Sequence, residues 1–298
     1  MLTHHRRRAR RGISLAELLV TCALTGLIGA VVLRTTVRQE RFYQAIAQIV
    51  ATRGAVYDAA NLLRHELRGV APASGGIYAL GPDAVDVRAP LGASVICSID
   101  ASRTTIGIPP HLDAPRSLTA WTTELQVGDT VLVYAAEPPD SARWLAHVVT
   151  ASPERGGDCP TASGFALTAA DAGAALALRL APPLPPLVGP GAALRFVRRT
   201  RYALYRAADA RWYLGVSDCL PTRATPCTAL QPVSGPFDAG GVRFVYRDSA
   251  DAETNDPARV ARIEIVLRSD SRAPLRAEGF TLGPFRDSLT LPITLRNP

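Results

Sequence analysis

The chain has 298 residues, of which 47% are hydrophobic, and a formal net charge of +7. This length is enough to bury a true hydrophobic core in one large domain or two small ones. All 33 basic residues are arginine, and five of them precede Gly12; without those five charges the remaining chain carries +2. The composition therefore does not indicate nucleic-acid binding by the main part of the chain.

The first apolar segment follows this arginine-rich head directly. Between Ile13 and Leu33 the ionisable residues are Glu17 and Cys22. A carboxylate within an apolar segment of membrane length costs about 2.5–3.5 kcal/mol, and such residues usually serve function. Glu17 is therefore the leading candidate for a functional residue in this part of the sequence.

Two ordinary interpretations of the head remain open. A secretory signal peptide also has a basic start and an apolar segment, but here the apolar run continues to Leu33 without a clean A-x-A cleavage site. A lipoprotein signal would end at Cys22, but Thr21 stands where glycine or alanine is expected.

The sequence Gly12-Ile13-Ser14-Leu15-Ala16-Glu17, between a basic head and an apolar helix, resembles the leader junction of type IV prepilins and type II secretion pseudopilins. The resemblance implies that prepilin peptidase cleaves between Gly12 and Ile13 and that the new N-terminus at Ile13 is methylated. It also implies that Glu17 contacts a neighbouring subunit during assembly. Ile13 departs from the phenylalanine that is usual in this family.

No proline occurs before Pro72, which permits one helix from Ser14 to Gly69, roughly 80 Å long at 1.5 Å per residue. We expect a cleaved leader at 1–12, a transmembrane helix at 13–35 and an amphipathic continuation at 36–70. An apolar stripe along the second half predicts packing against a sheet. Its members are Phe42, Ile46, Ile49, Val56, Ala60, Leu63 and Leu67.

Residues 71–298 change to short alternating or apolar runs between turn residues, which predicts a β-rich domain. The chain is thus expected to be α+β, with a long N-terminal helix packed on antiparallel sheets. A proline-rich connector at 182–192 is a possible sub-boundary. The expected strands are Ala84–Arg88, Ser94–Ile99, Thr104–Ile108, Thr130–Tyr134, Trp144–Thr150, Ala175–Leu180, Leu194–Arg206, Trp212–Val216, Val242–Arg247, Arg259–Arg268 and Leu289–Leu295.

Four cysteines follow the apolar helix, an even number that suits an oxidising compartment. Cys219 and Cys227 enclose a short proline-bounded loop that a disulfide could close, which leaves Cys97 to pair with Cys159. Four cysteines allow three connectivities, so this pairing is a preference. A zinc site is the alternative, but there is no C-x-x-C pair.

No pattern in the sequence indicates catalysis. There is no glycine-rich phosphate loop and no nucleophile elbow, and His65, His111 and His147 each stand alone. The acidic residues Asp248, Asp251, Glu253 and Asp256 could bind calcium but lack an EF-hand frame, so we interpret them as a solvated connector. We expect no enzyme activity, no cofactor and no metal.

Four late segments are similar to the larger minor pilins and J-type pseudopilins: Arg201–Arg206, Gly241–Tyr246, Val260–Arg268 and the terminal Leu295-Arg296-Asn297. The resemblance implies a minor pilin near the tip of a type IV pilus or in its initiation, or alternatively a J-like pseudopilin of a type II secretion system. It implies other pilin or pseudopilin subunits, prepilin peptidase and the inner membrane as partners. The N-terminus would be cytoplasmic, the domain periplasmic, and the assembled subunit at the cell surface.

An alternative of another class is a membrane-anchored module that binds a surface polysaccharide or solute. A groove lined by Trp121, Trp144 and Trp212 would favour it, but these residues are scattered in the sequence.

Overall fold

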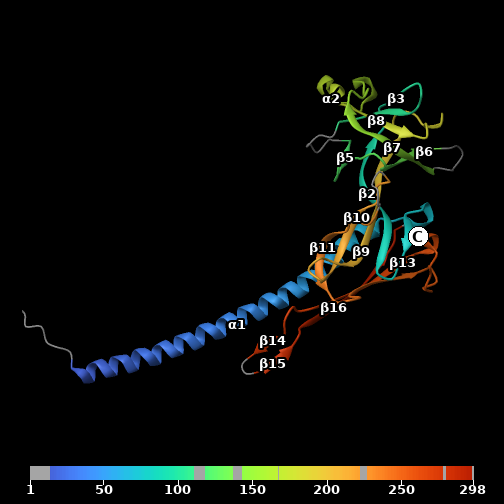
Figure 1. The fold of residues 1–298 in the computed structure, drawn as a ribbon. Coiled ribbons are helices and arrows are strands. Elements are labelled where there is room, and N and C mark those ends of the chain that lie inside the picture. The colour runs from blue at the N-terminus through green and yellow to red at the C-terminus, as the bar shows by residue number, and fades with distance from the viewer. Residues whose placement is uncertain are drawn as a thin grey trace, which may run out of the picture. The chain divides into compact units, whose positions relative to one another are not determined.

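The computed structural model describes residues 14–110, 118–136, 143–166, 168–221, 227–277 and 280–296 (Figure 1). These residues form a long helix and antiparallel sheets, which confirms the α+β prediction at this level. The chain divides into two units, Met1–Ala51 with Ser271–Phe285 and Thr52–Asp270 with Arg286–Pro298. The predicted processing residues Gly12 and Ile13 and the isolated His111 lie outside the described residues.

Within these described ranges, the α-helices are α1 (Leu15–Arg68) and α2 (Ala169–Gly173). The strands are β1 (Ile77–Leu80), β2 (Ala84–Val95), β3 (Ser98–Ile99), β4 (Thr105–Ile108), β5 (Ala120–Trp121), β6 (Thr130–Ala135), β7 (Arg143–Arg155), β8 (Leu176–Ala181), β9 (Ala193–Arg206), β10 (Trp212–Asp218), β11 (Gln231–Phe237), β12 (Val242–Arg247), β13 (Arg262–Asp270), β14 (Leu275–Ala277), β15 (Phe280–Gly283) and β16 (Arg286–Thr294).

Helix α1 begins and ends within one residue of the range that the sequence predicts. It continues over 54 residues because no proline interrupts its hydrogen-bond ladder. Gly69 follows its last residue, and the backbone N–H of Val70 donates to the carbonyl of Leu67 at 3.1 Å. The backbone N–H of Arg296 donates to the carbonyl of Arg68 at 3.3 Å, so two carbonyls of the final turn are satisfied.

The first unit contains α1 up to Ala51 and the hairpin of β14 and β15. The side-chain oxygen of Gln48 accepts a hydrogen bond from the backbone N–H of Ala273 at 3.2 Å. Phe42 and Ile46, which the sequence placed on a core-facing stripe, are 61% and 41% exposed. The stripe prediction is wrong for these two residues, because the buried face of α1 begins only at Thr52.

In the second unit, the last third of α1 lies in a hydrophobic cluster shared with two sheets. Val56, Leu63 and Leu67 are fully buried there, as the stripe predicts. The larger sheet has 11 strands with the order β1-β2-β9-β6-β7-β8-β4-β3, to which β5, β10 and β11 add; the smaller has the order β12-β13-β16. Both contribute side chains to this cluster, so the helix end is fixed by the sheets on which it packs.

A second hydrophobic cluster lies further along the same long strands. Strands β2 and β9 are paired antiparallel over most of their lengths, and β9 supplies Leu194 and Phe196 to this cluster and Tyr202 and Leu204 to the first. The proline-rich connector after β8 contributes Leu184 and Val188 to the second cluster. The sub-boundary expected at 182–192 stays a prediction.

Strand prediction succeeded where the apolar pattern was continuous. The hairpin of β9 and β10 pairs Arg206 with Trp212 across the expected turn. Strand β11 was missed because it contains Pro232 and Pro236, which argue against a strand. Among the strands that the structure describes it pairs only with β10, at an edge, where proline is tolerated.

Candidate functional site

The start of α1 is closed by a reciprocal pair of hydrogen bonds. The backbone N–H of Ser14 donates to Oε2 of Glu17 at 3.1 Å, and the backbone N–H of Glu17 donates to Oγ of Ser14 at 3.2 Å. This is a capping box, in which a serine N-cap and a glutamate three residues later satisfy two exposed donors. The S-x-x-E spacing could have revealed this local role of Glu17, which our interpretation of the sequence overlooked.

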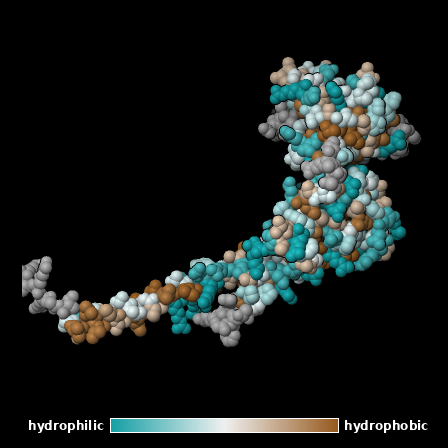
Figure 2. All heavy atoms as spheres, in the orientation of Figure 1, coloured by the Kyte–Doolittle hydropathy of each residue, from teal (hydrophilic) through white to brown (hydrophobic). Residues whose placement is uncertain are grey.

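The apolar half of α1 has no protein surface to cover it among the described residues. Ten large aliphatic side chains between Leu15 and Leu33 are each more than half exposed, and Figure 2 shows hydrophobic residues gathered along this end of the helix. Burying such a side chain is worth about 1.5–3 kcal/mol. This segment is long and apolar enough to span a membrane.

The polar groups on this segment are compatible with an apolar environment. Thr21 and Thr25 donate their hydroxyl hydrogens to the carbonyls of Glu17 and Thr21 at 2.9 Å and 2.7 Å. Because the helix satisfies its own backbone groups and these hydroxyls bond back to it, no donor of the two threonines needs water. The free thiol of Cys22 is exposed on the same segment.

Two glycines leave part of this surface open. A Cβ built on Gly26 or Gly29 would meet no atom within 4 Å. Small residues allow the backbone of a second helix to approach closely in a membrane, where packing replaces the hydrophobic effect as the driving force. The segment thus has the surface features of a helix that associates with other helices.

The cysteines form two disulfides in the second unit. Cys97 is bonded to Cys159 and Cys219 to Cys227, the two pairs that the sequence favours. Asp86 lies close to the second pair, and these three residues are a candidate metal cluster by distance. Both sulfurs are bonded to each other, so they offer no thiolate to a metal.

Buried charges elsewhere are used in ion pairs. Arg198, on β9, donates to both carboxylate oxygens of Asp129 at 2.6 Å and 2.8 Å, and to Asp218 at 3.0 Å. The hydrogen bond with Asp129 is the main cause that raises the pKa of Arg198. Asp86 accepts from Arg199 at 2.6 Å. Arg198 and Arg199 lie on β9 between the residues that supply the two hydrophobic clusters, and their ion pairs with Asp129, Asp218 and Asp86 join β9 to neighbouring parts of the sheet.

The other candidate groups of the sequence are separated or occupied. Asp248 accepts hydrogen bonds from the backbone of Ala250 and Ala252 and from Arg259, so the acidic connector uses its carboxylates locally. His147 is buried, with Nδ1 2.7 Å from the carbonyl oxygen of Pro182.

The three tryptophans contact different neighbours. Trp121 packs edge-on against Phe196 and Trp144 against Tyr134, while Trp212 packs on the first cluster.

The first half of α1 therefore brings together a capped carboxylate, an exposed apolar surface and an open glycine surface, features that the fold itself does not require. Comparison of the chain with protein-family models, with curated proteins and with solved structures gives no match in any of the three.

Proposed function

We propose that this chain is a structural minor pilin, anchored in the inner membrane by the first half of α1 and assembled through that helix into a type IV pilus. The supporting observation is the exposed apolar surface between Leu15 and Leu33, on a helix whose last third is fixed in a β-rich domain. The function of such a helix is to pack beside other helices, first in the membrane and then in a filament.

The leader supports the direction of insertion. Arginines before the apolar segment favour a cytoplasmic N-terminus, which places the following domain in the periplasm. Two disulfides in that domain suit an oxidising compartment. Prepilin peptidase would cleave after Gly12, and a mature chain beginning with methylated Ile13 is the expected product by mass spectrometry. A mature chain that begins with lipidated Cys22 would contradict the proposal.

The charge of Glu17 can be tested separately from its capping role. Glu17→Gln keeps an oxygen that accepts from the backbone N–H of Ser14 but removes the charge, whereas Ser14→Ala removes the Oγ of the cap and keeps the charge. We expect Glu17→Gln to insert into the membrane and fail to enter sheared filaments, and Ser14→Ala to assemble. Equal assembly of Glu17→Gln and wild type would refute a role for the charge.

The same strains separate the pilus from a secretion system. Loss of filaments with normal protein secretion supports the minor pilin, whereas loss of secretion with filaments intact supports a J-like pseudopilin. Both outcomes are scored on the full chain expressed at the wild-type level.

A further inference from the structure

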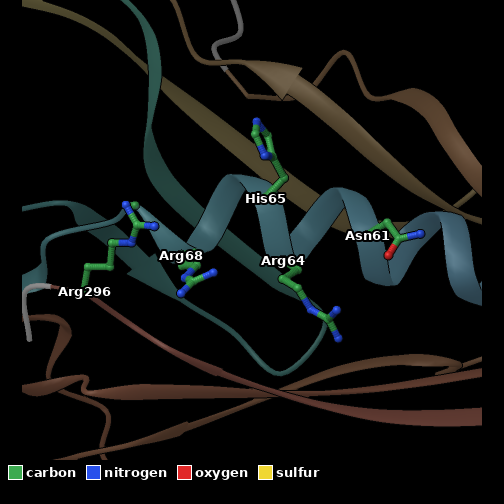
Figure 3. A pocket seen from close by; sticks show the side chains of 6 residues that line it. Asn61, Arg64, His65, Arg68 and Arg296 are labelled. Carbon is green, nitrogen blue, oxygen red and sulfur yellow. The ribbon is translucent and has the colours of Figure 1, made fainter.

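A basic pocket lies at the C-terminal end of α1. It has a volume of about 430 Å³ and is lined by the last two turns of the helix and by the segment after β16. The lining residues are Asn61, Arg64, His65, Arg68, Gly69 and Arg296. In Figure 3, Arg64 and Arg68 leave the same side of the helix, His65 points away from them, and Arg296 reaches the helix end from another segment.

The backbone beneath these arginines is firmly held. Leu63 and Leu67 are fully buried next to Arg64 and Arg68, and Leu295, beside Arg296, is 2% exposed. The hydrogen bond from Arg296 to the carbonyl of Arg68 joins the two segments. Two guanidinium groups from α1 and one from the segment after β16 are thus carried by a fixed backbone.

None of these guanidinium groups has a hydrogen bond or an ion pair with a residue that the structure describes. Some arginines elsewhere in the second unit are paired: Arg198, Arg199 and Arg259 each have a carboxylate within 3.0 Å. Glu66, the acid nearest in sequence, acts on Tyr202 instead: burial, and then the charge of Glu66, raises the pKa of the Tyr202 phenol. On the helix it is two residues from both Arg64 and Arg68 and so does not share their face.

Stabilisation of the C-terminal end of α1 by nearby cations does not explain why these three arginines lie together. Cations stabilise the last turn of a helix, but the effect falls off within that turn, and Arg64 stands one turn earlier than Arg68. The carbonyls of Leu67 and Arg68 are satisfied by backbone donors instead of these side chains. Arg64 and Arg68 are also a like-charge pair at i and i+4, which destabilises a helix. The cluster is thus a local cost unless an anion offsets it.

We propose that this pocket binds a small soluble compound that carries two linked phosphate groups. The planar fork of a guanidinium matches the oxygens of a phosphate, and charge-assisted pairs of this kind are strong. Three arginines carry a charge of +3, which one carboxylate cannot balance, whereas a phosphate group carries about −1.5 to −2 at pH 7. The volume lies within the range typical of small-molecule sites.

The test is calorimetric titration of the full chain, in non-ionic detergent micelles, with sodium pyrophosphate. Saturable binding at one site is expected, with no saturable binding of acetate. Arg64→Ala, Arg68→Ala and Arg296→Ala should each weaken it by about tenfold to a hundredfold, the range for one charged hydrogen-bonding group. Arg64→Lys keeps the charge but loses the fork, and its binding should fall between wild type and Arg64→Ala.

Arg155→Ala is the matched control, because Arg155 is exposed on β7 and its loss changes the net charge equally. Its affinity should stay within about twofold of wild type, since it tests only the long-range field. Absence of pyrophosphate binding by the wild-type chain at millimolar concentration would overturn the proposal. An equal loss in Arg155→Ala and Arg64→Ala, or acetate binding as tight as pyrophosphate binding, would overturn it as well.

Discussion

The ion pair between Arg198 and Asp129 provides a sharp test of how the second unit is held together. Both side chains are at most 2% exposed, and two short hydrogen bonds join them. Asp129 also accepts from the backbone N–H of Gln126 at 2.7 Å. Asp129→Asn keeps the shape of the side chain and one acceptor oxygen. It removes the buried counter-charge of Arg198, which is then left with the partly exposed carboxylate of Asp218.

Breaking a buried pair by removing one charge typically costs about 3–5 kcal/mol, a large part of a total stability of about 5–15 kcal/mol. We expect a loss of this size for Asp129→Asn. Asp218 is the matched control: its carboxylate is 37% exposed and meets Arg198 through one contact at 3.0 Å. Asp218→Asn should therefore cost only about 0–1 kcal/mol, the range for exposed pairs.

The assay is urea unfolding of the full chain in detergent micelles, followed by tryptophan fluorescence. Trp121 reports on this region because it packs against Phe196, two residues before Arg198 on β9. Adding Arg198→Met to Asp129→Asn removes the unpaired cation and should restore part of the stability. Equal losses in Asp129→Asn and Asp218→Asn, or no recovery in the double variant, would refute the reasoning.

Two further predictions concern packing and pH. Leu63→Ala should cost about 2–5 kcal/mol in urea unfolding, since Leu63 is fully buried in the first cluster, whereas Val50→Ala, at a 63% exposed position, should cost less than about 0.5 kcal/mol. Burial, and then the charge of Asp270, raises the pKa of Asp238, so ionisation of this carboxyl opposes folding. The protonated carboxyl of Asp238 therefore favours the folded state. This contribution to stability is complete below the unfolded-state pKa of about 3.9 and is lost as the pH rises through the pKa of the folded state. Asp238→Asn should therefore be more stable than wild type at pH 7, with the difference vanishing near pH 3 in thermal unfolding; a constant difference across this range would contradict the assignment.

The sequence predicted the features that depend on local pattern. Helix α1 and the hairpin of β9 and β10 follow from runs of apolar residues and from the positions of proline and glycine. The partners of Arg198 could not be predicted, because Asp129 lies 69 residues away and only strand pairing brings the two together. For the same reason, the sequence did not predict that Arg296 lies near Arg64 and Arg68. Arg296 follows β16, and the pairing of that strand brings it to the end of the helix.

The assembly role of Glu17 stays a prediction, and the structure changes how the charge of this residue should be understood. Glu17 was singled out because a lone carboxylate in an apolar segment is costly. The capping box reduces that cost within a single chain, since the carboxylate accepts from Ser14 and lies at the positive end of the helix dipole. A neighbouring subunit is therefore not needed to explain why a glutamate is tolerated at this position. The cap needs an acceptor oxygen but no charge, and glutamine supplies the oxygen without the charge. Glu17→Gln therefore tests a role in assembly without removing the cap. Comparison of Glu17→Gln with Ser14→Ala is for that reason more decisive than Glu17→Ala, which removes both roles at once.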